Sequence, residues 1–253
     1  MPPDQVHRPK LAAPPPLDVR RHALFLDLDG TLVEIAATPE DVVASAALRD
    51  TLGRLGHAMD GALALVTGRT IESADRILDG AVENIAGVHG FERRLAGAHH
   101  CAESDLAPLA AACAEARGLA DAGLLRARIE DKAAAMALHY RHAPEAAWEV
   151  RRAADELADR HGLSVLEGKM VVELTLGVRT KGDAVAAFMH APTFAGRTPM
   201  AVGDDVTDED AFAAACALGG AGVLVGEPRP TSATYHLADS AQVAAWLTEA
   251  LDR

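Results

Sequence analysis

The feature that most constrains this chain is a short apolar run that stops abruptly at acidic residues. Residues 23–26 are Ala-Leu-Phe-Leu, and residues 27–31, Asp-Leu-Asp-Gly-Thr, follow directly, with carboxylates at Asp27 and Asp29. Such a run predicts a buried strand that ends in a loop. Ligands bind beyond the carboxyl ends of strands in open α/β sheets, so the two carboxylates stand where such a fold performs chemistry. Their i, i+2 spacing allows one to attack a substrate while the other transfers a proton.

The same alternation of strand and helix recurs along both outer parts of the chain. Further apolar runs at residues 62–66, 84–88, 199–203 and 221–225 are separated by segments with helical periodicity. This order predicts a parallel sheet with right-handed crossovers. We therefore expect an α/β fold with a Rossmann-like core domain over residues 22–100 and 177–253.

The middle of the chain has a different pattern: helix, two strands, helix, two strands. It predicts a compact α+β domain inserted over residues 101–176. Side chains two apart on a strand share a face, so His139 and Arg141 are expected on a polar face of this domain's sheet. By the same alternation, the polar face also carries Glu167, Lys169 and Glu173.

Composition excludes several classes of function. The 253 residues contain 24 Lys and Arg against 37 Asp and Glu, a net charge of −13, which disfavours nucleic acids and anionic membranes as partners. Cys101, Cys113 and Cys216 are odd in number and widely spaced, which indicates a reducing compartment such as the cytoplasm. No run is long enough to span a bilayer. Residues 1–21 are rich in proline and are expected to form a disordered leader, and a monomer is expected.

Polar residues stand at expected strand ends or helix starts in four places. In chain order they are Asp27 with Asp29, Thr67, Lys181, and Asp204 with Asp205 and Asp208. This order resembles the four motifs of the haloacid-dehalogenase-like hydrolases, specifically their Mg²⁺-dependent phosphatases. The resemblance implies that Asp27 attacks phosphorus to form an aspartyl-phosphate. It also implies that Asp29 protonates the leaving oxygen and then activates water, while Thr67 and Lys181 bind phosphoryl oxygens.

The resemblance implies a Mg²⁺ site as well. A cation must neutralise the phosphate charge that repels a nucleophile, and carboxylate and carbonyl oxygens suit this hard ion. The implied ligands are the carboxylates of Asp27 and Asp204 and the backbone carbonyl of Asp29. Asp205 and Asp208 would orient these ligands or Lys181.

Several segments carry a closer resemblance, to the trehalose-6-phosphate phosphatases. They are residues 66–69, 88–92, 138–141, 167–173, 181–182 and 203–212. The resemblance spans residues 22–250 and implies that a core domain hydrolyses trehalose 6-phosphate while the inserted cap domain recognises the sugar. It implies a substrate-binding set made of Asp27, Leu28, Asp29, Thr67, Gly68, Arg69, His89, Gly90, Glu92, Arg141, Glu167, Lys169 and Glu173.

Some interpretations stay open at this level. Arg69 is interpreted more readily as the partner of a carboxylate than as a substrate ligand. Thr175 and Leu176 stand where we would expect an Arg-Pro pair in this family. Because cap residues decide the sugar, phosphatases of the sucrose-phosphate or mannosylglycerate-phosphate type are alternatives, as is a sugar phosphomutase. Glu209 is interpreted as an ordinary acidic residue in the first turn of a helix, which the helix dipole favours.

Overall fold

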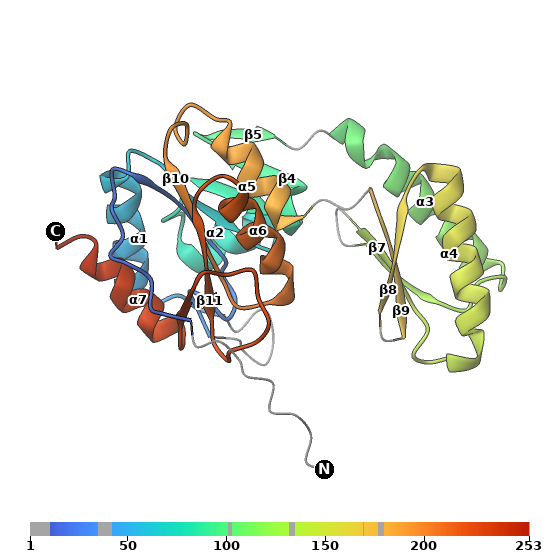
Figure 1. The fold of residues 1–253 in the computed structure, drawn as a ribbon. Helices are drawn as coiled ribbons and strands as arrows, with labels where there is room; N and C mark the ends of the chain where they lie inside the picture. Colours follow the sequence, from blue (N-terminus) through green and yellow to red (C-terminus); the bar gives the residue numbers. More distant parts are fainter. Residues whose placement is uncertain are drawn as a thin grey trace, which may run out of the picture. The chain divides into compact units, whose positions relative to one another are not determined.

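The computed structural model describes residues 11–34, 42–100, 103–131, 135–168, 170–176 and 180–252. The chain forms two compact units, one made of Met1–His100 and Thr180–Arg253 and the other of Cys101–Arg179 (Figure 1). We refer to them as the core unit and the cap unit. Within the described ranges, no helix has the length and apolar character that crossing a membrane requires.

The core unit contains an eight-stranded sheet with the order β12-β11-β10-β1-β2-β3-β4-β5. Neighbouring strands from β12 to β3 run parallel, whereas β4 and β5 are antiparallel to their neighbours. The strands are β1 (His22–Leu26), β2 (Leu63–Val66), β3 (Asn84–Gly87), β4 (Glu92–Leu95), β5 (Ala98–His100), β10 (Thr198–Gly203), β11 (Ala221–Val225) and β12 (Tyr235–Leu237).

Helices lie on both faces of this sheet. The pair α1 and α7 is in contact on one side and the pair α5 and α6 on the other (Figure 1). The helices of the core unit are α1 (Ala46–Ala58), α2 (Ile71–Leu78), α5 (Lys181–Met189), α6 (Glu209–Ala217) and α7 (Ser240–Glu249).

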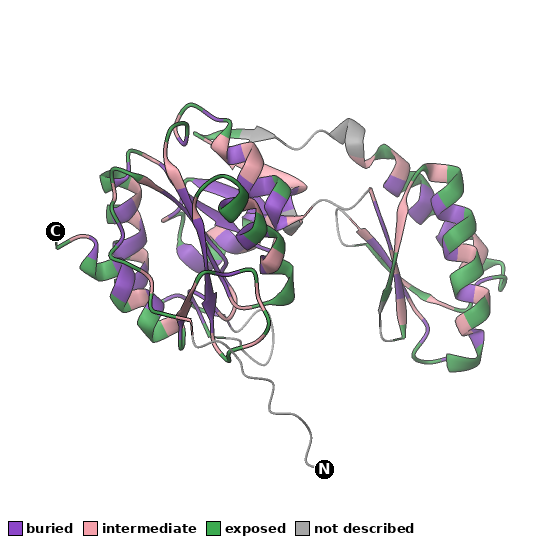
Figure 2. Ribbon diagram, in the orientation of Figure 1, coloured by how far each residue is buried: buried purple, intermediate pink, exposed green. Residues whose placement is uncertain are grey.

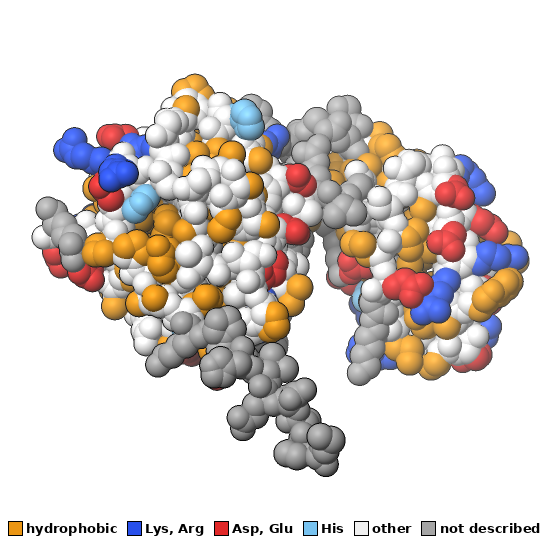
Figure 3. Space-filling view, in the orientation of Figure 1, with side chains coloured by type: hydrophobic (Ala, Val, Ile, Leu, Met, Phe, Trp, Pro, Cys, Tyr) orange, Lys and Arg blue, Asp and Glu red, His pale blue; other side chains and the backbone are white. Residues whose placement is uncertain are grey.

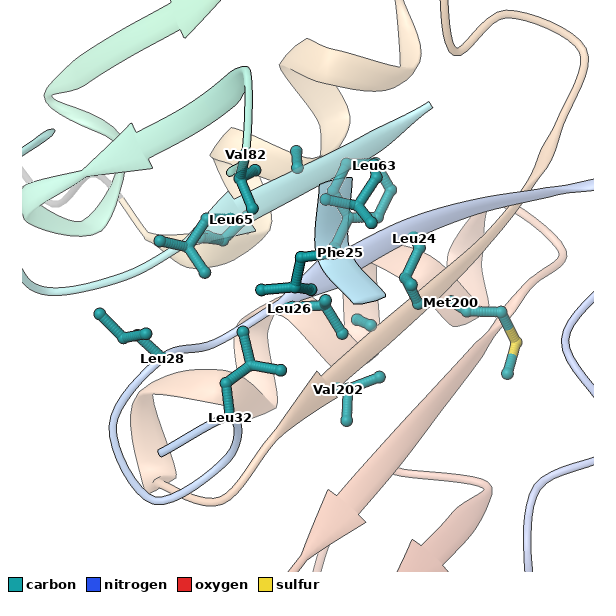
Figure 4. Packing of buried hydrophobic residues seen from close by; sticks show 14 of the residues in the cluster. Leu24, Phe25, Leu26, Leu28, Leu32, Leu63, Leu65, Val82, Met200 and Val202 are labelled. Atoms are coloured by element: carbon teal, nitrogen blue, oxygen red, sulfur yellow. The ribbon is translucent and has the colours of Figure 1, made fainter. Parts of the chain in front are cut away.

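The position of the central strand β1 explains why the loop that carries Asp27 and Asp29 begins at residue 27. It lies between β10 and β2, and helices cover both faces of the sheet, so its side chains are buried on both faces and its sequence is a continuous apolar run. The strands in the middle of the core sheet are largely buried (Figure 2). Leu24, Phe25 and Leu26 of β1 pack in this core (Figure 4), and Phe25 stacks on Phe194 with ring centroids 5.5 Å apart. Asp27 therefore emerges at the carboxyl edge of the sheet.

The sequence predicted five parallel strands, and the structure adds three short ones. The sequence of β4 is Glu-Arg-Arg-Leu and that of β12 is Tyr-His-Leu, so neither contains an apolar run of the kind that marks the central strands. They extend the sheet at its two edges, where residues need not be buried on both faces. Their pairing is therefore set by neighbouring strands rather than by a local pattern.

The predicted leader needs a correction for residues 11–21, whereas residues 1–10 lie outside the described part. Leu17 is buried in the main apolar core, and Ala12 forms a bridge to Tyr235 of the edge strand β12. The indole Nε1 of Trp246 donates to the carbonyl of Pro15 at 2.8 Å. Prolines do not prevent this packing, because an extended segment beside an edge strand needs few backbone donors.

The cap unit is a four-stranded antiparallel sheet with two helices on one face. The strand order is β6-β7-β9-β8, and buried apolar side chains of both helices and the sheet form a second core. Charged side chains of both signs are interspersed over its α4 helix (Figure 3). The elements are α3 (Glu103–Asp121), β6 (Arg128–Asp131), β7 (Ala135–His139), α4 (Ala147–His161), β8 (Ser164–Gly168) and β9 (Val171–Thr175).

Candidate active site

A buried lysine joins two carboxylates at the carboxyl edge of the core sheet. Lys181 Nζ lies 2.7 Å from Asp27 Oδ1 and 2.8 Å from Asp208 Oδ1. All three residues are buried. Lys181 begins α5, where a positive charge opposes the helix dipole. Reciprocal hydrogen bonds between Thr180 and Asp183 cap this end of the helix and help to hold the lysine there.

Asp208 is placed by a short turn after β10. The 3₁₀ helix Val206–Asp208 brings its carboxylate back to the backbone, where Oδ2 accepts from the Asp205 N–H at 3.0 Å. A Cβ on Gly203 would lie 2.1 Å from Asp208 Cγ, so only glycine permits this approach. The Asp205 side chain instead accepts a hydrogen bond from Thr207 and is exposed. Asp205 thus supports Asp208 through its backbone.

Asp204 is held against the loop that follows β1. Thr31 is buried, and its hydroxyl donates to Asp204 Oδ1 at 3.2 Å. Gly30 has a φ of 79°, and a Cβ there would lie 2.2 Å from Asp204 Oδ2. Gly30 permits the close approach of this carboxylate, and Thr31 holds it there. The sequence alone predicted no role for Thr31.

The carboxylates fit a divalent cation. Asp27, Asp204 and Asp208 each offer an oxygen, and these oxygens lie within 4.8 Å of one another. Three carboxylates against the one ammonium of Lys181 leave two formal negative charges, which a divalent ion would neutralise. Hard oxygen donors of this kind are what Mg²⁺, Ca²⁺ and Mn²⁺ prefer. The side chain of Asp208 stands in this group, although the sequence predicted only an orienting role for it.

The pKa shifts in this cluster show that Lys181 neutralises only part of the negative charge of the three carboxylates. Burial, together with the charge of Asp208, raises the pKa of Asp27 to about 7, although Lys181 opposes the shift. Burial and Asp208 also raise the pKa of Asp204. Burial acts to lower the pKa of Lys181, but the charges of Asp27 and Asp208 outweigh it and raise that pKa.

The second carboxylate of the motif, Asp29, is engaged by Arg69. The guanidinium donates from Nε to Oδ2 at 2.6 Å and from Nη2 to Oδ1 at 2.8 Å. Such a two-point contact fixes the plane of the carboxylate. Arg69 therefore pairs with a carboxylate, which is the role favoured from the sequence. Asp29 keeps a third of its side chain exposed, so it stays accessible.

Thr67 and Leu28 lie beside these groups. Thr67 is buried at the end of β2, and its Oγ1 accepts from the Arg69 N–H at 3.2 Å. The Leu28 side chain is buried, and its backbone N–H donates to the Asp27 carboxylate. Leu28 can therefore act only through its backbone. Gly68 is exposed beside Thr67.

The segment after β3 has a mainly structural contact. Glu92 Oε2 accepts from the Ile71 N–H at 3.0 Å, so this carboxylate caps the start of α2. Gly90 is buried, has a φ of 103° and would bring a Cβ within 3.3 Å of Ala184. The side chain of His89 and the whole of Lys169 lie outside the described residues.

Several charged side chains gather on the cap sheet. A cavity of about 650 Å³ is lined by Arg128, Glu130, His139, Arg141 and His142. His139 Nε2 lies 2.7 Å from Glu130 Oε2. Leu138 and Tyr140, which alternate with His139 and Arg141, are buried in the cap core. Arg141 is thus brought together with His139, and Arg128 and Glu130 are neighbours that the sequence did not single out.

The register of the β8–β9 hairpin corrects the expected position of Glu167. Gly168 pairs with Val171, so Glu167 lies opposite Val172, and Leu166 lies opposite Glu173. Directly paired residues share a face. Val172 faces the cap helices, and Glu167 accordingly contacts Arg151 of α4 at 3.1 Å. With two residues in the turn, odd-numbered residues of β8 pair with even-numbered residues of β9. Glu173 therefore lies on the face opposite to Glu167.

Comparisons with known proteins agree with this geometry. A profile of the family described as trehalose-phosphatase matches residues 25–241. A probable trehalose-phosphate phosphatase from Sinorhizobium fredii is 42% identical over 92% of this chain and 89% of its own length. A trehalose-6-phosphate phosphatase from Escherichia coli is 38% identical over 90% of this chain and 85% of its own.

Solved structures give the same result for the fold. The crystal structure of a trehalose-6-phosphate phosphatase related protein matches with a TM-score of 0.68 and 28% identity, covering 90% of this chain and 96% of that one. The predicted fold class, a haloacid-dehalogenase-like α/β core with an inserted α+β cap, is confirmed. The chain belongs to the trehalose-phosphatase family.

Proposed function

We propose that this protein is a Mg²⁺-dependent phosphatase that hydrolyses trehalose 6-phosphate to trehalose and phosphate. The observation that carries the proposal is the buried Lys181–Asp27 contact of 2.7 Å beside the carboxylates of Asp204 and Asp208. Relatives at 38% and 42% identity are named as phosphatases of this sugar phosphate. A buried nucleophile, a cation site and an adjacent proton carrier are the parts that phosphoryl transfer through an aspartate needs.

In the first half of the proposed reaction, Asp27 is the nucleophile. Its carboxylate oxygen forms a bond to phosphorus while the bond from phosphorus to the sugar oxygen breaks. The leaving oxygen takes the electron pair and a proton from Asp29. Lys181 supplies positive charge beside the phosphoryl oxygens. Thr67 accepts from the backbone N–H of Arg69, and its own hydroxyl proton remains available to a phosphoryl oxygen.

In the second half, water cleaves the aspartyl-phosphate. The water oxygen bonds to phosphorus, Asp29 takes the proton of the water, and the carboxylate of Asp27 departs with its electron pair. Arg69, which contacts Asp29 at 2.6 and 2.8 Å, orients this carboxylate in its ionised form, the form that takes the proton of the water. Trehalose has left by then, so phosphate is the second product.

The ion is proposed to be Mg²⁺, held by Asp27, Asp204 and Asp208 together with the backbone carbonyl of Asp29. When bound, it neutralises phosphate charge and so makes phosphorus a better electrophile. The fit rests on the oxygen-only donor set and on the two formal negative charges that Lys181 leaves uncompensated.

We also propose that Arg141 and Glu173 of the cap sheet bind sugar hydroxyls. Glu173 lies on the face opposite the helices α3 and α4, and Arg141 lines the cavity beside His139. Carboxylates and guanidinium groups each engage neighbouring hydroxyls through paired hydrogen bonds. Glu167 is left out of this proposed set because it contacts Arg151 on the helix-covered face.

The test is release of inorganic phosphate from trehalose 6-phosphate, glucose 6-phosphate and sucrose 6-phosphate, with Mg²⁺ and with a chelator. Metal-dependent release that strongly favours trehalose 6-phosphate supports the proposal. Preference for another sugar phosphate would retain the chemistry and replace the substrate. An isomerised sugar phosphate without net phosphate release would identify a mutase and overturn the proposal.

A further inference from the structure

The backbone that carries Asp204 is held by an arginine from a distant loop. Arg229 Nη2 donates to the carbonyl of Asp205 at 2.7 Å and to the carbonyl of Asp204 at 3.3 Å. Arg229 lies between β11 and β12, and with Gly30 and Asp204 it lines a cavity of about 450 Å³. One guanidinium thus contacts two consecutive carbonyls of the loop that follows β10.

Glu209 holds this arginine in place. Its Oε1 forms an ion pair with Arg229 Nη1, and its Oε2 accepts from the Ser232 N–H at 2.7 Å and from the Thr231 hydroxyl at 3.1 Å. Glu209 therefore has a tertiary role, although its position in the sequence indicated only an acidic first turn.

Arg229 and Glu209 connect two carboxylates of the cation site, Asp204 and Asp208, to the loop between β11 and β12. Asp204 is reached through its own carbonyl, and Asp208 is the direct chain neighbour of Glu209. A displacement of the backbone at residues 204 and 205 would break the contacts to Arg229 and would move the Asp204 carboxylate away from Asp27 and Asp208. The contacts therefore restrict the carboxylate to the geometry in which the three oxygens lie within 4.8 Å of one another.

We propose that Arg229 and Glu209 are positioning residues that set the affinity of the divalent-cation site by fixing the backbone of Asp204. The inference rests on the proposed function only in its use of that cation site. Groups that orient metal ligands typically change metal affinity about 10- to 100-fold when they are removed. Neither residue is proposed to touch the substrate.

The test is Mg²⁺ binding to the full chain, measured by isothermal titration calorimetry without substrate. Arg229→Gln and Glu209→Gln should each raise the Kd for Mg²⁺ by about 10- to 100-fold. Arg229→Lys should give an intermediate Kd, because an ammonium keeps the charge but cannot span two carbonyls and a carboxylate. Circular dichroism establishes that each variant is folded at the temperature of the titration.

Arg197→Gln is a matched control. Arg197 Nη1 donates to the carbonyls of Val19 at 2.8 Å and His22 at 3.2 Å, and its Nη2 pairs with Asp60 at 3.2 Å. It makes the same kinds of contact at the opposite end of β1, so its loss should leave the Kd for Mg²⁺ unchanged.

Two outcomes would overturn the inference: a folded Arg229→Gln that binds Mg²⁺ like the wild type, or an equal loss of affinity in Arg197→Gln. The readout contains no sugar phosphate. A wild-type protein that binds Mg²⁺ but does not hydrolyse trehalose 6-phosphate would therefore refute the proposed function and leave this inference standing.

Discussion

Asp27 is the residue at which folding and catalysis make opposing demands. A nucleophile must be shielded from water and ionised, yet burial beside Asp208 raises its pKa to about 7. The charge of Lys181 offsets only part of this rise in the pKa of Asp27. In the metal-free protein, the folded state therefore favours a protonated Asp27 at pH values where the unfolded chain has an ionised one.

This shift predicts how stability depends on pH in the presence of a chelator. The unfolded carboxyl ionises near its model value of 3.8, whereas the folded one stays protonated up to about 7. Between these values the folded state binds more protons, so the contribution of Asp27 to the free energy of unfolding falls as pH rises, by at most about 1.4 kcal/mol per pH unit.

Urea unfolding at pH 5 and pH 7.5 with EDTA would measure this dependence, with Asp27→Asn as the control that lacks the titration. The free energy of unfolding of the wild type, measured relative to Asp27→Asn, should be lower at pH 7.5 than at pH 5. A wild type that gains stability over Asp27→Asn between the two pH values would contradict the assignment of a raised pKa.

The same substitution tests the nucleophile. Asp27→Asn should lower kcat for phosphate release by on the order of 10⁴-fold or more, because an amide cannot form the acyl-phosphate. Binding of a divalent cation should weaken but folding should persist, which calorimetry and circular dichroism can check. Turnover near the wild-type rate in this variant would remove Asp27 from the proposed role.

At this scale, the sequence predicts a role for residues whose chemistry and local motif coincide. Asp27, Asp29, Lys181 and Asp204 each stand at a strand end or helix start within a short recognisable pattern. Arg229 could not be found in this way, because it acts on carbonyls 24 and 25 residues earlier in the chain. Such contacts depend on how two loops meet, which no local spacing encodes.

Among the elements, the β8–β9 hairpin shows where a sequence pattern stops being informative. The strands themselves were predicted from their composition. Simple alternation places Glu167 and Glu173 on one face only if the strand continues without a turn. The pairing of Gly168 with Val171 leaves two residues in a turn between the strands. After such a turn, odd positions on one strand share a face with even positions on the other. Glu167 and Glu173 consequently lie on opposite faces.

This difference gives a paired prediction for the cap. Glu173→Ala should lower kcat/KM for trehalose 6-phosphate by roughly 10- to 100-fold, because sugar hydroxyls lose a charged acceptor, while a small aryl phosphate ester should be affected less than about twofold. Glu167→Ala should change neither substrate appreciably, since it removes only a contact with Arg151. Steady-state kinetics on both substrates would measure this.

Equal losses on the two substrates for Glu173→Ala would mean that this face does not recognise the sugar. A selective loss for Glu167→Ala instead would show that the helix-covered face does so. The two glutamates differ in neither charge nor size, so their comparison isolates the effect of the face.

For the whole molecule, the decisive property is that its two units have separate apolar cores. The core unit buries residues of the eight-stranded sheet and its helices, and the cap unit buries residues of α3, α4 and the four-stranded sheet. The described carboxylates of the cation site all belong to the core unit. The alternation of elements along the chain predicted this division, because a helix–strand–strand pattern cannot continue a parallel sheet.

Differential scanning calorimetry should therefore resolve two transitions, of which Mg²⁺ raises one. An ion that binds only the folded core unit stabilises it by about 2.7 kcal/mol at a hundredfold excess over its Kd, equivalent to about 5 to 10 °C for a unit of this size. Leu52→Ala in α1 should lower the Mg²⁺-sensitive transition, and Leu157→Ala in α4 should lower the other, because each leaves a cavity at a fully buried position. If Mg²⁺ instead raised the transition that Leu157→Ala lowers, the cation would have to be bound by the cap, and the cation site at Asp27, Asp204 and Asp208 would be refuted.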